Sequence, residues 1–220
     1  MFFFIREVIL FPAKEKIMQT IVGLLVGIGL SAACGFRVFI PMLGMSIAAI
    51  SGHIELSHGF EWIGTWPVLI AFATATALEI GAYYIPWIDH ILDTLMTPAA
   101  AVAGTILTAS MLGDLSPFFK WSLAIIAGGG VSAIVQGGTV ALRAASSGAT
   151  GGLANFFVST GELFGSSLVT VFAILLPVLC FFVVLLICAL MIRKMLKSAS
   201  VKKLFSTSDD DNSTKPDVDL

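Results

Sequence analysis

Long apolar runs fill the chain between residues 17 and 192, without the strict alternation of a β-strand. An α-helix needs about 20 apolar residues to cross the ~30 Å hydrocarbon core of a bilayer, and these runs approach or exceed that length. Backbone groups in lipid must be hydrogen-bonded within the protein, which favours helices over open strands. The pattern therefore predicts an all-α, polytopic membrane protein of about six spans, some of them broken or re-entrant.

The first apolar run, residues 18–50, is too long for a simple crossing. It contains Gly35 and Pro41, and a proline removes a helix hydrogen bond and clashes with the preceding turn. We expect the helix to break between these two residues. The second span, residues 62–84, has aromatic residues at both ends, as is typical of interfacial belts: Trp62, Trp66, Tyr83 and Tyr84.

Residues 85–98 are bracketed by Pro86 and Pro98 and are expected to form a short interfacial or re-entrant helix. A third span should follow Pro98 and end near residue 112. The chain then turns at residues 113–120 and crosses again over residues 121–142.

A segment rich in Gly, Ser and Thr, residues 144–161, is a poor lipid-facing helix. It is expected either to cross as a short span or to re-enter the membrane buried in protein. The last apolar run, residues 163–192, should cross with a bend at Pro177.

Composition supports a single membrane domain. Of the 220 residues, 57% are hydrophobic and 12% are charged, against about 25% charged in soluble domains. The charges crowd at the ends, so we expect an interfacial segment at 1–16, a membrane domain at 17–197 and a disordered acidic tail at 198–220. Basic residues flank both ends of the membrane domain, and the positive-inside rule then predicts that both termini are cytoplasmic.

Four charges stand alone in otherwise uncharged apolar runs: Arg37, Glu79, Arg143 and Glu162. A charge at the centre of a bilayer costs at least about 2.5–3.5 kcal/mol, so it usually faces the protein interior or a watery cavity. We expect these residues to bind a substrate or ion, or else to form structural ion pairs that hold broken helices together. Asp89 and Asp93 lie one turn apart and are either further ion-binding candidates or an interfacial polar face.

A short motif occurs twice. Residues 29–33 (GLSAA) reappear at 130–134 (GVSAI), and each copy is followed by an arginine and then by a glutamate. Three expected spans separate the copies, which would invert the second relative to the first, as in many secondary transporters. This predicts an inverted 3+3 repeat with halves at 17–113 and 119–197; the alternative is chance similarity in a chain rich in small residues.

Three stretches, residues 29–43, 79–104 and 141–162, carry a resemblance to a known family. The matching positions are Gly35, Arg37 and Pro41 in G-x-R-x-x-x-P; Glu79, Pro86, Asp89 and Pro98 in E…P-x-x-D…P; and Arg143, Ser159 and Glu162 in R…S-x-x-E. The chain thereby resembles a bacterial membrane family catalogued as domain of unknown function four-one-two-six. The family often has acids where this chain has Tyr83 and Leu163. The resemblance implies a multi-pass protein of the bacterial inner membrane and no particular activity.

Transport is the function class that these features favour. Arg37 and Arg143 would bind a small anion or a lipid phosphate, or pair with the glutamates, and a buried carboxylate would carry a proton or cation. The alternative is a non-catalytic assembly or partner protein with structural Arg/Glu pairs. The helix-packing signal Gly23-x-x-x-Gly27 then permits a homo-oligomer.

An enzyme is not expected, because the chain has no HExxH, GxSxG or paired-cysteine motif. We therefore expect no cofactor and no metal; His53 and His58 are read as solvated loop residues. Nucleic acid is not expected either, because the basic residues form no aromatic-interleaved patch.

Overall fold

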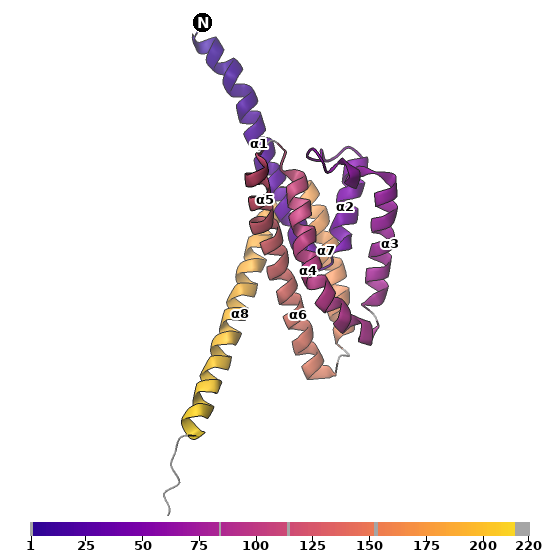
Figure 1. The fold of residues 1–220 in the computed structure, drawn as a ribbon, viewed down its shortest axis with the longest axis vertical. Helices are drawn as coiled ribbons and strands as arrows, with labels where there is room; N and C mark the ends of the chain where they lie inside the picture. The colour runs from indigo at the N-terminus through magenta and orange to yellow at the C-terminus, as the bar shows by residue number, and fades with distance from the viewer. Residues whose placement is uncertain (1, 84, 114, 152–153, 214–220) are drawn as a thin grey trace, which may run out of the picture.

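Every regular element is a helix within the residues that the computed structural model describes, 2–83, 85–113, 115–151 and 154–213. This confirms the all-α prediction. Five helices in these ranges are long and apolar enough to cross a membrane, so the class of helical membrane protein is supported and a sixth span is not confirmed. Figure 1 shows their arrangement, with the elements α1 (Phe2–Cys34), α2 (Phe39–Ile50), η1 (Glu61–Gly64), α3 (Trp66–Ala82), α4 (Pro86–Met111), α5 (Pro117–Leu123), η2 (Ala124–Gly129), α6 (Gly130–Thr150), α7 (Asn155–Leu175) and α8 (Pro177–Ser213).

The predicted break after Gly35 is confirmed, and it turns the first run into a helical hairpin. α1 ends at Cys34, and the next N–H groups, those of Gly35 to Arg37, close the end by bonding carbonyls of its last turn. Pro41 lies in the first turn of α2, where its missing N–H leaves no bond unmade. α2 then returns alongside α1, so residues 18–50 are not one kinked span.

Pro98 does not break the chain as predicted. α4 runs without interruption from Pro86 to Met111 and contains Pro98 in its interior. A proline removes only one hydrogen bond of the helix. After Pro98, α4 packs against α1 and η2 at Gly104 and Thr108, and before it Asp93 binds Arg143 of α6. Pro86 begins α4, so the predicted break there is confirmed.

The second half also divides differently from the prediction. Residues 117–150 form one continuous helical rod in which η2 is a π-helical stretch. The segment 144–161 is therefore not an element of its own: it holds the end of α6, a turn with Gly151 at φ 63°, and the start of α7. At Pro177 the predicted bend is a full break between α7 and α8.

Small residues let α1 and α4 approach closely. The position of a Cβ on Gly27 lies 2.9 Å from Thr108 Cα, and that on Gly23 lies against the Met111 carbonyl oxygen. Ser31 Oγ donates to the Gly104 carbonyl at 2.7 Å. As the residue number rises along α1 it falls along α4, so the two helices are antiparallel, and the Gly23-x-x-x-Gly27 signal is used inside this chain.

η2 and α6 pack against α4 in the same manner, at residues that α1 also contacts. Ser132 Oγ donates to the Ala100 carbonyl at 2.6 Å, and Gly128 lies against Gly104 and Thr108. This pair is also antiparallel, so α1 and α6 run in the same direction. The two Ser-Ala copies are therefore not inverted, and the inverted 3+3 repeat is not confirmed; its premise failed because α1 and α2 reverse direction within the first run.

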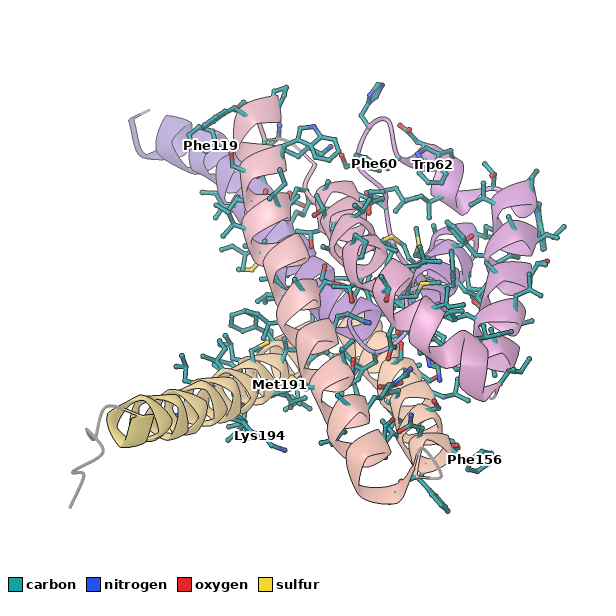
Figure 2. All side chains as sticks on the ribbon, turned by 60° about the horizontal axis from the view of Figure 1, so that its bottom comes forward. Phe60, Trp62, Phe119, Phe156, Met191 and Lys194 are labelled. Atoms are coloured by element: carbon teal, nitrogen blue, oxygen red, sulfur yellow. The ribbon has the colours of Figure 1, made fainter. Side chains whose placement is uncertain are left out.

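Four parts of the chain meet at one end of the bundle, which we call the α1 face. One depression there is lined by residues between Lys16 and Val26 on α1 and by His53 to His58 after α2. Met111 at the end of α4, Gly113 after it, Ile174 near the end of α7 and Pro177 at the start of α8 complete the lining. The opposite end, which we call the α6–α7 face, holds Thr150 at the end of α6 and Asn155 at the start of α7. Figure 2 shows Phe60, Trp62 and Phe119 at the α1 face. It shows Phe156 and Lys194 toward the α6–α7 face.

α8 starts at the α1 face and runs away from it, so the start of α1 and the end of α8 lie at opposite ends of the molecule (Figure 1). An even number of crossings is not confirmed. The segment 1–16 was expected to be separate but continues into α1, and α8 extends to Ser213 through most of the expected tail. Residues 214–220 lie outside the described ranges.

Candidate functional site

Three of the four isolated charges meet in the half of the bundle near the α6–α7 face. Arg143 lies seven residues before the end of α6 (150 − 143), and Glu162 lies seven residues after the start of α7 (162 − 155). At about 1.5 Å of rise per residue, both lie roughly 10 Å inside the helix ends. Arg37 reaches the same depth from the tip of the α1–α2 hairpin.

Arg143 binds two carboxylates of the site. Its Nε donates to Glu162 Oε1 at 3.0 Å, its Nη2 contacts Glu162 Oε2, and its Nη1 donates to Asp93 Oδ1 at 2.9 Å. The arginine is only 3% exposed. This fork between two carboxylates is the bidentate geometry that a planar guanidinium favours, and it joins α6 to α4 and α7.

Arg37 lies on the other side of the same glutamate. Its Nη2 donates to the Ser159 carbonyl oxygen at 3.1 Å and lies 4.0 Å from Glu162 Oε2. Arg37 is 1% exposed, so its charge is removed from both lipid and water. Glu162 is thus the carboxylate that the two arginines share.

The ring of Tyr83 lies between the two guanidinium groups. Arg37 Cζ is 3.8 Å and Arg143 Cζ is 4.1 Å from the ring centroid. Cation–π contacts of this kind strengthen when they are desolvated, and Tyr83 is buried. The prediction that Tyr83 belongs to an interfacial belt is therefore wrong, while Tyr84 lies outside the described residues.

Glu79 has a role that the sequence did not predict. Its Oε1 accepts from the N–H of Val38 at 2.9 Å, and its Oε2 accepts from the N–H of Phe39 at 3.1 Å. These N–H groups open α2, so the carboxylate closes the helix N-terminus, where the helix dipole favours a negative charge. Glu79 and Tyr83 lie one turn apart on α3, which joins this cap to the arginine cluster.

Of the two acidic candidates on α4, only Asp93 has a described side chain. Asp93 belongs to the site through Arg143, with its side chain 15% exposed. The backbone of Asp89 lies in α4, but its side chain, like that of Pro86, is outside the described residues.

The site holds more acid than base among the described side chains. Two arginines lie near three carboxylates: Glu162 and Asp93, which they contact, and Glu79, which caps α2 beside them. With every group ionised, the cluster carries one excess negative charge. Such a cluster suits a proton or a cation better than an anion, because the arginine donors already face carboxylates.

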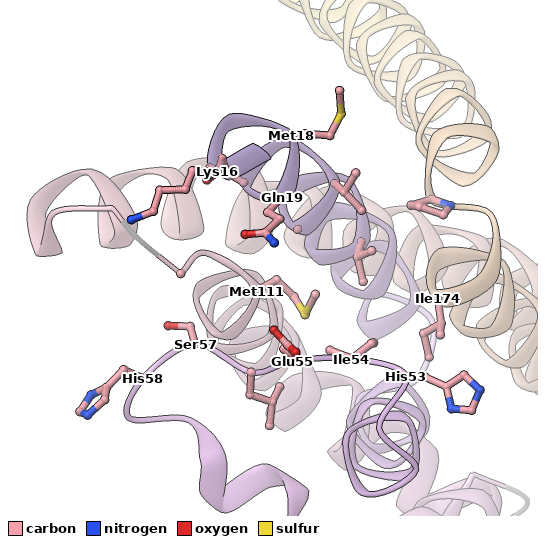
Figure 3. Close-up of a pocket in the computed structure, with 17 residues that line it drawn as sticks. Lys16, Met18, Gln19, His53, Ile54, Glu55, Ser57, His58, Met111 and Ile174 are labelled. Carbon is pink, nitrogen blue, oxygen red and sulfur yellow. Dashed lines mark hydrogen bonds between the residues drawn. The ribbon is translucent and has the colours of Figure 1, made fainter. Parts of the chain in front are cut away.

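The α1 face has a different character. Its depression has a volume of about 620 Å³ and includes Lys16, Glu55 and both loop histidines (Figure 3). Beside it, the backbone N–H groups of Glu61 itself and of Gly59 hold the pKa of the Glu61 carboxyl below its usual range. None of the arginine cluster lines this depression. Within the ranges that the structure describes, no group of three or more His, Cys, Asp or Glu is placed to hold a metal ion.

These features define a helical membrane protein with a buried arginine–carboxylate cluster. The model of the family described as domain of unknown function (DUF4126) matches residues 24–197. The chain belongs to this family, as the resemblance of its motifs indicated. No curated protein and no solved structure matches it.

Sequence reasoning found the charges and missed part of what surrounds them. Tyr83 looked like a belt aromatic because it follows the last turn of a span, and only its spacing of four residues from Glu79 hinted at a shared face. The cap of Glu79 on α2 had no signal in the sequence, because the partners are 40 or more residues apart and one of them is a backbone group.

Proposed function

We propose that this protein is a small transporter or channel-like protein whose conducted or coupling ion is a proton or a small cation. The observation that carries the proposal is the cluster of two arginines and three carboxylates, buried about two helical turns inside the bundle. Charges in a membrane domain are expensive and usually mark ion or proton pathways. The excess carboxylate favours a positively charged substrate over the small anion or lipid phosphate that two arginines would otherwise suggest.

Glu162 is the group on which we expect the activity to depend. It contacts both arginines, so gaining a proton or binding a cation there would weaken both contacts at once. α7, which carries Glu162, and the α1–α2 hairpin, which carries Arg37, would then be free to separate. No enzymatic step and no cofactor are part of this proposal.

Flux measurements on the purified protein in liposomes test it. An imposed membrane potential should drive proton, sodium or potassium uptake faster than in empty liposomes, and E162Q should lose the increase. E55Q changes an exposed carboxylate at the α1 face and serves as the matched control, with flux unchanged. If the unaltered protein carries none of the three cations, transport of a small cation is wrong.

A second candidate is a non-catalytic assembly or partner protein in which the same charges form a structural clamp. It is favoured by the burial of both arginines and by the position of the depression at the α1 face, away from them. Buried ion pairs can often be replaced by well-packed neutral residues without loss of stability. A clamp therefore predicts that the double variant R143M/E162Q folds and keeps its biological role. Gly23 and Gly27 are used within the chain, so a homo-oligomer would need another surface.

For the location, we propose the inner (plasma) membrane of a bacterium, with the α6–α7 face toward the cytoplasm. The exposed Arg193 and Lys194, and the lysines that follow them, lie at the end of α8 that points away from the α1 face. The positive-inside rule favours that end as cytoplasmic. The N-terminus would then lie on the outer side, which replaces the expectation that both termini are cytoplasmic.

A further inference from the structure

Polar side chains follow the last turns of α6 and the first turns of α7, between the arginine cluster and the α6–α7 face. They recur at spacings of three or four residues, which places them along one side of each helix. On α6 they are Arg143, Ser146, Ser147 and Thr150, and on α7 they are Asn155, Ser159 and Glu162. Because α6 and α7 are antiparallel neighbours, these residues form successive levels between the surface and the cluster.

The innermost and outermost levels are closed by contacts across the two helices. Arg143 and Glu162 meet at the inner level. At the outer level, Asn155 Nδ2 donates to Ser147 Oγ at 2.9 Å, and the N–H of Ala154 donates to Thr150 Oγ1 at 3.1 Å. The outer level is exposed at Thr150, where the α6–α7 face meets the surroundings.

The middle level is different. The hydroxyl oxygens of Ser146 and Ser159 are both buried, and neither has a hydrogen-bond partner among the residues described. A buried hydroxyl without a partner costs about 1–3 kcal/mol. By contrast, the buried serines Ser31, Ser132 and Ser166 each donate to a backbone carbonyl of another helix.

Two buried hydroxyls beside an ion cluster can stabilise a water molecule or a partly hydrated cation. The hydroxyl oxygens provide hydrogen-bond partners for the water or ligands for the cation, and the water or cation satisfies the hydroxyls in turn. In the opposite direction, Thr170 Oγ1 of α7 is a single buried hydroxyl without a partner among the described residues. Around it, the bundle between the cluster and the α1 face holds bonded serines such as Ser31 and fully buried apolar side chains such as Leu107.

We propose that the interface between the end of α6 and the start of α7 is a hydrated access route, through which a proton or small cation reaches Glu162 from the α6–α7 face. Ser146 and Ser159 line the route, and Asp93, partly exposed, lies at its inner margin beside Arg143. This inference rests on the proposed function and adds to it the side of access and the residues that provide it.

Accessibility of substituted cysteines tests the route. S146C and S159C are made in the otherwise unaltered chain, whose own three cysteines are buried. A membrane-impermeant methanethiosulfonate reagent is applied separately to each side, with intact cells and inside-out vesicles. S166C is the matched control, because Ser166 is a buried serine of α7 seven residues (166 − 159) further from the α6–α7 face.

Both S146C and S159C should be labelled from the α6–α7 side only, and the parent protein and S166C should not be labelled. Absence of labelling from either side at both positions, or equal labelling from both sides, overturns the route. Size-exclusion profiles check folding, and S146C decides the question if S159C does not fold. If the protein carries cations but neither cysteine is labelled, the access route is wrong and the proposed function stands. If both cysteines are labelled but no cation is carried, the route stands and the proposed function is wrong.

Discussion

A guanidinium group buried at membrane depth needs partners at its edge and over its faces, because it has five N–H donors and a flat charged surface. Arg143 places carboxylates at its edge, and Tyr83 covers one face of both arginines. The ring separates two like charges that Glu162 holds within one cluster. Tyr83 therefore stabilises the site without contributing a charge.

Replacing this ring should show how much it contributes. Y83F keeps the aromatic face and should leave the thermal unfolding temperature in detergent nearly unchanged. Y83L keeps an apolar side chain without the ring, and it should destabilise the protein by about 1–4 kcal/mol, because two desolvated cation–π contacts are lost. Equal unfolding temperatures for Y83L and Y83F would mean that the ring only fills space.

At the scale of the elements, the bundle is organised around α4, which packs against α1 and against η2 and α6. Hydrophobicity does not select helix partners within a bilayer, so close backbone approach and interhelical hydrogen bonds must do so. Gly27, Gly104 and Gly128 provide the approach, and Ser31 and Ser132 provide the bonds. The hairpin tip that carries Arg37 is positioned by this packing.

Adding a methyl group at the α1–α4 contact should weaken it. The Cβ in G27A would lie 2.9 Å from the Thr108 Cα, a backbone atom that cannot move alone. We expect a loss of about 1–3 kcal/mol, the usual cost of overpacking. G130A is the control, because no atom lies within 4 Å of the added Cβ; it should be neutral or gain about 0.5–1 kcal/mol in a helix. Unfolding in detergent measures both, and equal stabilities would contradict the packing argument.

At the scale of the whole molecule, the direction of each helix decides which groups share a face. The hairpin of α1 and α2 brings residues 53–58 back to the level of Lys16. α3, α4 and α6 therefore run opposite to the direction expected from a single first span. The two ends of the chain separate as a result, and the arginine cluster lies nearer to the α6–α7 face than to the depression.

Labelling of exposed single cysteines can check this arrangement. E55C lies in the loop at the α1 face, and T150C ends α6 at the other face, and both side chains are exposed. A membrane-impermeant maleimide should reach E55C from one side of the membrane and T150C from the other. A reporter fused after residue 220 should lie on the same side as T150C. Labelling of both cysteines from one side would refute the alternating directions of the helices.

Local information in the sequence determined the class of the protein, the break after Gly35 and the isolated charges. Hydropathy, proline positions and the cost of a charge in lipid depend only on neighbouring residues. Pro98 shows the limit of local patterns: it signals a break, yet α4 continues through it, because long-range packing of α4 outweighs the single hydrogen bond that a proline removes.

Only the tertiary structure decided which groups meet. Arg37 and Ser159 are 122 positions apart, and the Glu79 carboxylate caps a helix that begins 40 residues before it. No periodicity connects such partners, because their contact depends on the direction and packing of every helix between them. The sequence determined where charge enters the membrane domain; the fold decided that Glu162 is shared by two arginines, that Tyr83 separates them and that serines of α6 and α7 lie on one side of them.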